Sequence, residues 1–130
     1  MKLMKTHIVV NAIKEFDAFR SRIMGIPYER KGVLYSEAFL LYLCTLIAPP
    51  QRIQESGRAR GQSTLLLSSL FPDRPVISVE FDARSPDTEV ARLRLSGRTN
   101  VDVRFGDATQ RLSTRRSITD GCSRVLSLPA

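Results

Sequence analysis

The sequence predicts an α/β protein in which a partial doubly wound parallel sheet follows two helices. After Pro50, strand-like and helix-like stretches alternate in the order β-α-β-α-β. The helices between the strands are long enough to cross over the sheet, which makes the strands parallel. A glycine turn from Gly57 to Gly61 joins the first strand to its helix, and such a turn brings backbone N–H groups to a bound ligand. The 130 residues, 42% of them hydrophobic, suit one small domain with its own core.

The first 50 residues predict two helices. Apolar side chains recur at gaps of three and four over residues 8–24, and Gly25 and Pro27 end that helix. The apolar positions are Val9, Ile13, Phe16, Phe19 and Ile23. Ser36 offers an N-cap for a second helix over residues 37–48. Because this second helix is apolar nearly all round, we expect it to pack in the interior or against another chain.

The elements of the sheet follow from composition and from helix start signals. The sequence predicts a strand ending at Glu55, a helix over 62–70, a strand over 76–80, a helix from Pro86 to about Ser96 and a strand over 101–105. Ser85 before Pro86 is a strong helix start, since serine caps the helix and proline suits its first position. Strict alternation over the last strand predicts one wetter face.

The end of the chain does not continue this pattern. A doubly wound sheet has a fourth strand beside the first, but residues 109–124 are polar and turn-prone, and residues 125–128 form only a weak apolar run. We therefore expect no fourth strand. The sheet edge left open would promote self-association.

Composition narrows the classes of function. Cys44 and Cys122 form no CxxC pair, and His7 is the one histidine, so we expect no metal site. The longest apolar stretch, residues 38–48, is shorter than the roughly 20 residues of a membrane helix. The N-terminus has no apolar core of signal-peptide length. A cytoplasmic protein without a membrane partner is expected.

Arginine carries most of the net charge of +7, which permits contact with nucleic acid. The arginine-rich part comprises Arg92, Arg94, Arg98, Arg104, Arg111, Arg115 and Arg116. These side chains do not share one helical face cleanly, and no aromatic residue interleaves the first three. A solvated surface is therefore favoured over a phosphate-contacting stripe, and nucleic acid is the weaker choice of partner.

Three interpretations compete for the glycine turn. A dinucleotide fingerprint, G-x-G-x-x-G, fails because Ala59 and Gln62 stand where glycines are needed. A P-loop fails because three residues, rather than four, separate the glycines and Gln62 follows in place of lysine. What remains is an acid, Glu55, two residues before the first glycine, with a second acid, Glu80, at the end of the next strand. Glu80 lies 23 residues past Gly57, close to the roughly 20 expected of a ribose-binding carboxylate.

This constellation resembles the class I S-adenosylmethionine-dependent methyltransferases. The matching stretches are Glu55 to Ser63, Ser78 to Asp82 and Phe105 to Ala108. The family usually has a further glycine where Ala59 stands. The resemblance implies a Rossmann-like three-layer sandwich, of which residues 33–112 are the cofactor-binding half. Residues 1–32 would then form an N-terminal helical segment, and residues 113–130 an irregular tail.

The resemblance implies S-adenosylmethionine as the cofactor, with Glu55 facing its ammonium group. The cofactor is cationic and has no phosphate, so an acid beside the turn attracts it, whereas the acid would repel a pyrophosphate. Glu80 would accept both ribose hydroxyls, Asp107 would accept from the adenine amino group, and Phe81 would lie against the ring. The expected cofactor-binding residues are Glu55, Gly57, Gly61, Ser63, Glu80, Phe81, Asp107 and Ala108. Arg58 and Arg60 have no role towards a cationic cofactor.

Each of these residues also has a plain structural explanation, so the functional interpretation depends on the joint pattern. Glu55 or Glu80 alone is most often a solvated strand end, and Ser63 can cap or pack its helix. In the family, the substrate side is built from the fourth strand onward, so no catalytic base is nominated. Tyr28, Tyr35 and the loop at Arg30 are candidates to line a substrate mouth.

Two main hypotheses of function stay open. The first is a methyltransferase that transfers a methyl group to an unknown small-molecule or glycan-like acceptor. The second is a truncated, non-catalytic interaction module of the same fold. A basic nucleic-acid-binding protein is a third, weaker alternative.

Overall fold

The computed structural model describes residues 2–107 and 125–128. Its elements are α1 (Lys2–Ile23), α2 (Tyr35–Ile47), β1 (Arg52–Ser56), α3 (Gln62–Leu70), β2 (Val76–Glu80), α4 (Pro86–Leu95), β3 (Val101–Phe105) and β4 (Val125–Leu128). The helices and strands that the sequence predicts between residues 50 and 106 are all present, in the expected order. At α4, the Ser85 side chain accepts a hydrogen bond from Asp87 N (3.2 Å), so the predicted cap is confirmed.

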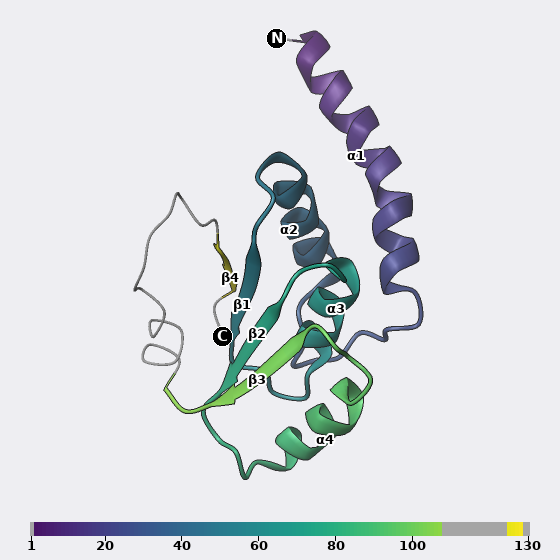
Figure 1. Ribbon diagram of the computed structural model, residues 1–130. Coiled ribbons are helices and arrows are strands. Elements are labelled where there is room, and N and C mark those ends of the chain that lie inside the picture. The colour runs from purple at the N-terminus through teal and green to yellow at the C-terminus, as the bar shows by residue number, and fades with distance from the viewer. Residues whose placement is uncertain (1, 108–124, 129–130) are drawn as a thin grey trace, which may run out of the picture.

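The strands form one parallel sheet in the order β3-β2-β1-β4. The register aligns Ile53 of β1 with Val76 of β2, and Val76 with Val101 of β3. Because the strands are parallel, the ends of β1, β2 and β3 and the segments that follow them lie at one edge of the sheet (Figure 1). The chain builds outward from β1 in one direction and returns to its other side with β4. Such a reversal of strand order is where open α/β sheets bind ligands.

The fourth strand corrects the prediction from sequence. β4 pairs with β1 in parallel, with Arg52 opposite Val125 and Glu55 opposite Leu128. A strand is held by main-chain hydrogen bonds, so a weak apolar run suffices once β1 offers a free parallel edge. The open edge expected beside β1 is therefore occupied, and the outer strands of the described sheet are β3 and β4. Self-association stays a prediction; the rest of the expected tail lies outside the described residues.

The core lies between the sheet and the helices that gather on one side of it (Figure 1). Ile53, Val76, Leu66 and Leu70 are fully buried there, from β1, β2 and α3. Because side chains alternate between the two faces of a strand, Glu55 lies on the same face as Ile53, and Ser78 lies on the same face as Val76. Polar side chains at these positions are therefore covered by α3.

Helix α1 begins at Lys2, earlier than the residue 8 expected, and it buries Phe19 and Ile23 near its C-terminal end. The Phe19 ring is buried 5.0 Å from the ring of Phe39 and 5.9 Å from that of Tyr42, measured between centroids. In contrast, Ile13 is 64% exposed and Phe16 is 46% exposed. The predicted apolar stripe is thus only partly covered by the described residues.

Helix α2 starts at Tyr35, so Ser36 is not its cap. Leu34 holds the cap position, and the Glu37 carboxylate reaches back to accept from Leu34 N (3.0 Å), which satisfies the N–H of the cap residue itself. The helix buries Tyr42 but leaves Ile47 86% exposed, so it packs on one side. In the described ranges, no helix combines the length and apolar character that a membrane span requires.

Candidate functional site

The glycine turn between β1 and α3 has three backbone positions at positive φ. Gly57 lies at +81°, Ala59 at +44° and Gly61 at +80°. The need for glycine at two of them is confirmed, since side chains disfavour this region. A Cβ at Gly61 would also lie 3.1 Å from Ala91 Cβ, so the turn approaches α4 closely. Ala59 adopts the left-handed conformation despite its Cβ, at a cost of about 1 kcal/mol.

The carboxylate of Glu80, at the end of β2, accepts hydrogen bonds from this turn. Its Oε2 accepts from Arg58 N (3.0 Å) and Ala59 N (2.9 Å), and its Oε1 accepts from Phe81 N (2.9 Å). The prediction placed this carboxylate at the carboxyl end of the sheet beside the turn, and the structure places it there. The turn N–H groups are therefore capped by an acid that belongs to the neighbouring strand.

Glu55 occupies a different position from the one expected. β1 and β2 are neighbours, as expected, but the Glu55 side chain is only 2% exposed and lies under α3. Its carboxylate accepts from the hydroxyls of Ser63, Thr64 (2.5 Å) and Ser78 (2.7 Å). Three donors satisfy a buried charge, so this acid holds α3 to the sheet. Its expected contact with a ligand ammonium group stays a prediction, and the described contacts give it a structural role.

The remaining predicted residues lie around the ends of β2 and β3. Phe81 is 80% exposed directly after Glu80, and Asp107 is exposed after β3. Gly106 N donates to Glu80 O (3.0 Å), which ties the loop after β3 to the end of β2. The structure thus brings Glu80, Phe81 and Asp107 to the same edge of the sheet, while Ala108 lies outside the described residues.

A charge network fixes the turn from its other side and explains Arg60. Arg60 Nε lies 3.4 Å from Glu29 Oε2, and its Nη1 lies 3.6 Å from Asp87 Oδ1. Arg94 pairs with Glu29 and also donates to Arg60 O (3.0 Å), and Lys31 pairs with Asp87 (2.8 Å). The hydrogen bond from Arg94 holds the pKa of Glu29 below its usual value. The basic loop before α2, the glycine turn and α4 are therefore linked by charge.

Gln62, the first residue of α3, makes a second link to the same loop. Its side chain is 2% exposed, and its Oε1 accepts from Val33 N (3.1 Å). A Cβ at Gly32 would lie 2.1 Å from that oxygen, so the loop approaches α3 as closely as glycine allows. Nearby in sequence, Tyr28 and Tyr35 meet edge to face, 6.4 Å between centroids, and both are exposed. Their role at a substrate mouth stays a prediction.

Comparison with solved structures finds a similar fold in several methyltransferases. The O-methyltransferase TomG from Streptomyces achromogenes, solved in complex with SAM, shows 26% identity and a TM-score of 0.54 over 89% of this chain. A candidate O-methyltransferase from Klebsiella pneumoniae shows 25% identity and a TM-score of 0.54 over 78% of this chain. Cofactor-bound Rv0187 from MTB shows 26% identity and a TM-score of 0.52 over 78%. The fold is that of the class I methyltransferases.

The likeness covers only part of each of those proteins. This chain spans 49% of TomG, and 47% of each of the other two. No protein-family model matches the sequence, and no curated protein matches it. The methyltransferase fold is therefore established by the structure, over about half the length of these structural relatives.

Several polar residues that shape this methyltransferase fold escaped prediction from sequence. Thr64 and Ser78 complete the cage around Glu55, and Gln62 ties α3 to the loop before α2. A signal was present for Ser78, because a serine within the apolar run of β2 is buried and must find a partner. Thr64 and Gln62 carry no such signal, since threonine and glutamine in a helix are mostly exposed.

Proposed function

We propose that this chain binds S-adenosylmethionine and forms the cofactor-binding part of a methyltransferase. The observation that carries the proposal is the position of Glu80, whose carboxylate lies between the end of β2 and the N–H groups of the glycine turn. This acid is acceptor-only and is partly exposed, as a group that binds two ribose hydroxyls must be. The cofactor-bound relatives of the same fold support this choice of ligand.

Ribose binding would require Glu80 to exchange one contact. A carboxylate offers about four acceptor positions, and three of those of Glu80 take N–H groups. Two ribose hydroxyls then need one N–H to be released. The N–H of Phe81 is the most exposed of the three, so we expect that contact to open while the two contacts to the turn persist. The exposed Phe81 ring and Asp107 would contact the adenine.

A small-molecule hydroxyl is the proposed methyl acceptor. TomG is an O-methyltransferase involved in tomaymycin synthesis, which supports an oxygen acceptor on a small molecule for this chain too. Within this chain's part of the fold, the proposed chemistry is binding and orientation of the cofactor. Aligning a methyl donor with its acceptor is itself a large part of such catalysis.

The non-catalytic interaction module stays the second candidate. It is favoured by the apolar side chains that α2 exposes, Leu40 at 61% and Ile47 at 86%. A nucleic-acid stripe gains little support, because Arg92, Arg94 and Arg104 each pair with an acid. Those arginines are partly neutralised, which weakens their attraction for phosphate.

Calorimetric titration of the full chain with S-adenosylmethionine and S-adenosylhomocysteine tests the proposal. We expect micromolar binding that Glu80→Gln weakens by about 10- to 100-fold, the value of one or two charge-assisted hydrogen bonds. The matched control is Glu89→Gln, which makes the same change at an exposed acid of α4 that pairs with Arg92. A folded wild-type chain that binds neither compound would support the interaction module instead.

A further inference from the structure

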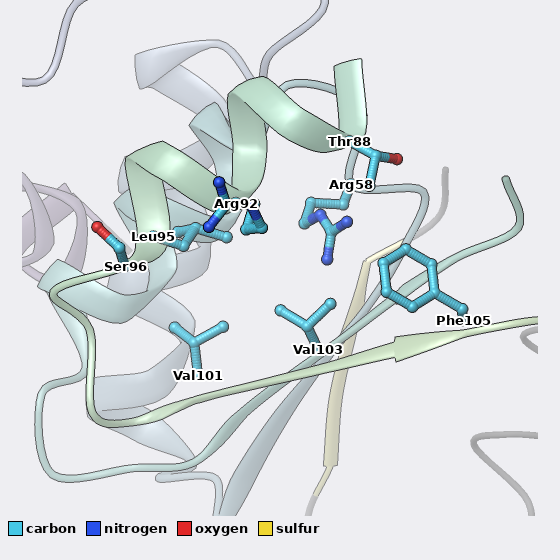
Figure 2. A pocket seen from close by; sticks show the side chains of 8 residues that line it. All are labelled: Arg58, Thr88, Arg92, Leu95, Ser96, Val101, Val103 and Phe105. Carbon is cyan, nitrogen blue, oxygen red and sulfur yellow. The ribbon is translucent and has the colours of Figure 1, made fainter. Parts of the chain in front are cut away.

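A pocket of about 200 Å³ lies between α4 and β3, and none of the predicted cofactor residues lines it. Val101, Val103 and Phe105, which share one face of β3, form its floor, and Leu95 of α4 lies across from them (Figure 2). Its volume is about seven times the roughly 30 Å³ share of one water molecule in the liquid, and it is smaller than a drug-sized site. A small molecule with an apolar body therefore suits it.

The polar side chains of the pocket are satisfied, with the exception of Arg58. Arg92 forms two hydrogen bonds to the Glu89 carboxylate, at 2.8 and 2.6 Å. The Thr88 hydroxyl donates to Asp82 O (2.8 Å), and the Ser96 hydroxyl donates to Leu93 O (2.9 Å). Among the described residues, the Arg58 guanidinium makes no hydrogen bond and no ion pair, and its buried Nε has no acceptor.

A buried arginine without a hydrogen bond or an ion pair is unusual. Arg58 is 2% exposed, and its guanidinium carbon lies 5.2 Å from the centre of the Phe105 ring. Figure 2 shows the group directed into the space above Val103. Burial lowers the pKa of Arg58, while the charges of Glu80 and Glu55 act in the opposite direction; an arginine stays protonated at neutral pH. A buried charge without a hydrogen-bonded partner is unfavourable, so an anion that entered the pocket would be favoured.

We propose that this pocket binds a small monocarboxylate with a flat apolar body, its carboxylate on Arg58 and its body between α4 and β3. The planar guanidinium matches a carboxylate in two parallel hydrogen bonds. The apolar floor suits a ring or a short hydrocarbon. A phosphate, which carries more charge, is the poorer fit because among the described lining residues only the Arg58 guanidinium lacks an acid partner.

Titration of the full chain with benzoate, followed by NMR or calorimetry, tests the site. We expect a dissociation constant of about 1 mM or below, as a ligand of this size allows. Benzyl alcohol, a neutral molecule of similar shape, should bind at least tenfold more weakly. Saturating S-adenosylhomocysteine should leave the benzoate affinity within twofold, because the pocket shares no residue with the predicted cofactor site.

Two variants and one control locate the binding. Arg58→Met keeps the length of the side chain without its charge and should weaken benzoate binding at least tenfold. Arg74→Met, the same change at an exposed arginine outside the pocket lining, should change it less than threefold. Val103→Trp, on the outer strand β3, fills the pocket and should abolish binding even if Arg58→Met does not fold.

Three results would each overturn the proposal. Equal affinity for benzoate and benzyl alcohol would show that the charge of Arg58 is not used. Unchanged binding in Val103→Trp would place the ligand elsewhere. Competition with S-adenosylhomocysteine would assign benzoate to the cofactor site.

Discussion

Replacing Ser78 by alanine tests how the chain keeps a carboxylate inside its core. Glu55 is 2% exposed and Ser78 is fully buried, and the hydroxyl donates to Glu55 Oε2 at 2.7 Å. A hydrogen bond to a charged group contributes about 1.5–3 kcal/mol. Two donors, Ser63 and Thr64, remain in the variant, so the carboxylate is not left bare. We therefore expect Ser78→Ala to lower the free energy of unfolding by about 2 kcal/mol.

Urea denaturation followed by circular dichroism measures this loss. For a slope of about 1–2 kcal/mol per molar urea, the midpoint should fall by about 1–2 M. Ser21→Ala is the matched control, since the Ser21 hydroxyl donates to Asp17 O on the exposed side of α1 and its removal should change stability by less than about 0.5 kcal/mol. If Ser78→Ala lost no more stability than Ser21→Ala, the hydroxyl cage would not be what stabilises the buried acid.

Two further substitutions test the contacts around the glycine turn. Gly32→Ala places a Cβ 2.1 Å from Gln62 Oε1, so it should lower the free energy of unfolding by about 1–3 kcal/mol, measured by thermal unfolding. Gly97→Ala is the control, because its Cβ would meet nothing within 4 Å. Equal melting temperatures of the two variants would refute the close approach. The pKa of Glu29 lies below its ordinary 4.5, mainly through its hydrogen bond from Arg94, so the stability that this pair adds is present above pH 4.5 and is lost as the pH falls through the lower folded pKa. Glu29→Gln should therefore be less stable than the wild type at pH 7, with urea midpoints that converge below pH 4.5; a difference that is constant with pH would contradict this.

The elements between residues 50 and 106 could be predicted because their signals are local. Ser85 and Pro86 mark the start of α4 in the sequence, and glycine marks the turn before α3. β4 could not be predicted with the same reasoning, since its partner, β1, lies about 70 residues earlier in the chain. The start of α2 was misplaced because Glu37 and Ser36 both offer caps, and composition does not say which one folds back to the helix end.

Only part of the candidate site could be predicted from the sequence. Glu80 could be placed beside the turn from strand order alone, because neighbouring parallel strands end at one edge. The burial of the Glu55 side chain was not anticipated from the sequence, although strand alternation indicates it. Ile53 and Glu55 are two residues apart and therefore share a face, and Ile53 is fully buried against the helices. An acid on the same strand face as a buried residue is also buried, and it needs hydrogen-bond donors. Its donor Ser78 lies on a different strand, so only the fold brings the two residues together.

The turn itself is held from both sides by groups outside it, and this bears on how it would bind a ligand. Glu80 holds the backbone N–H groups of Arg58 and Ala59, while Glu29 and Asp87 hold the side chain of Arg60. A turn fixed in this way needs little ordering when a ligand arrives, which favours affinity. The same Glu80 contacts also oppose a ligand that wants the carboxylate for itself. Cofactor affinity should therefore reflect the difference between two sets of hydrogen bonds to Glu80, those from the backbone N–H groups and those from the ribose hydroxyls. Arg58 takes part in the first set through its backbone, while its side chain lines the pocket beneath α4.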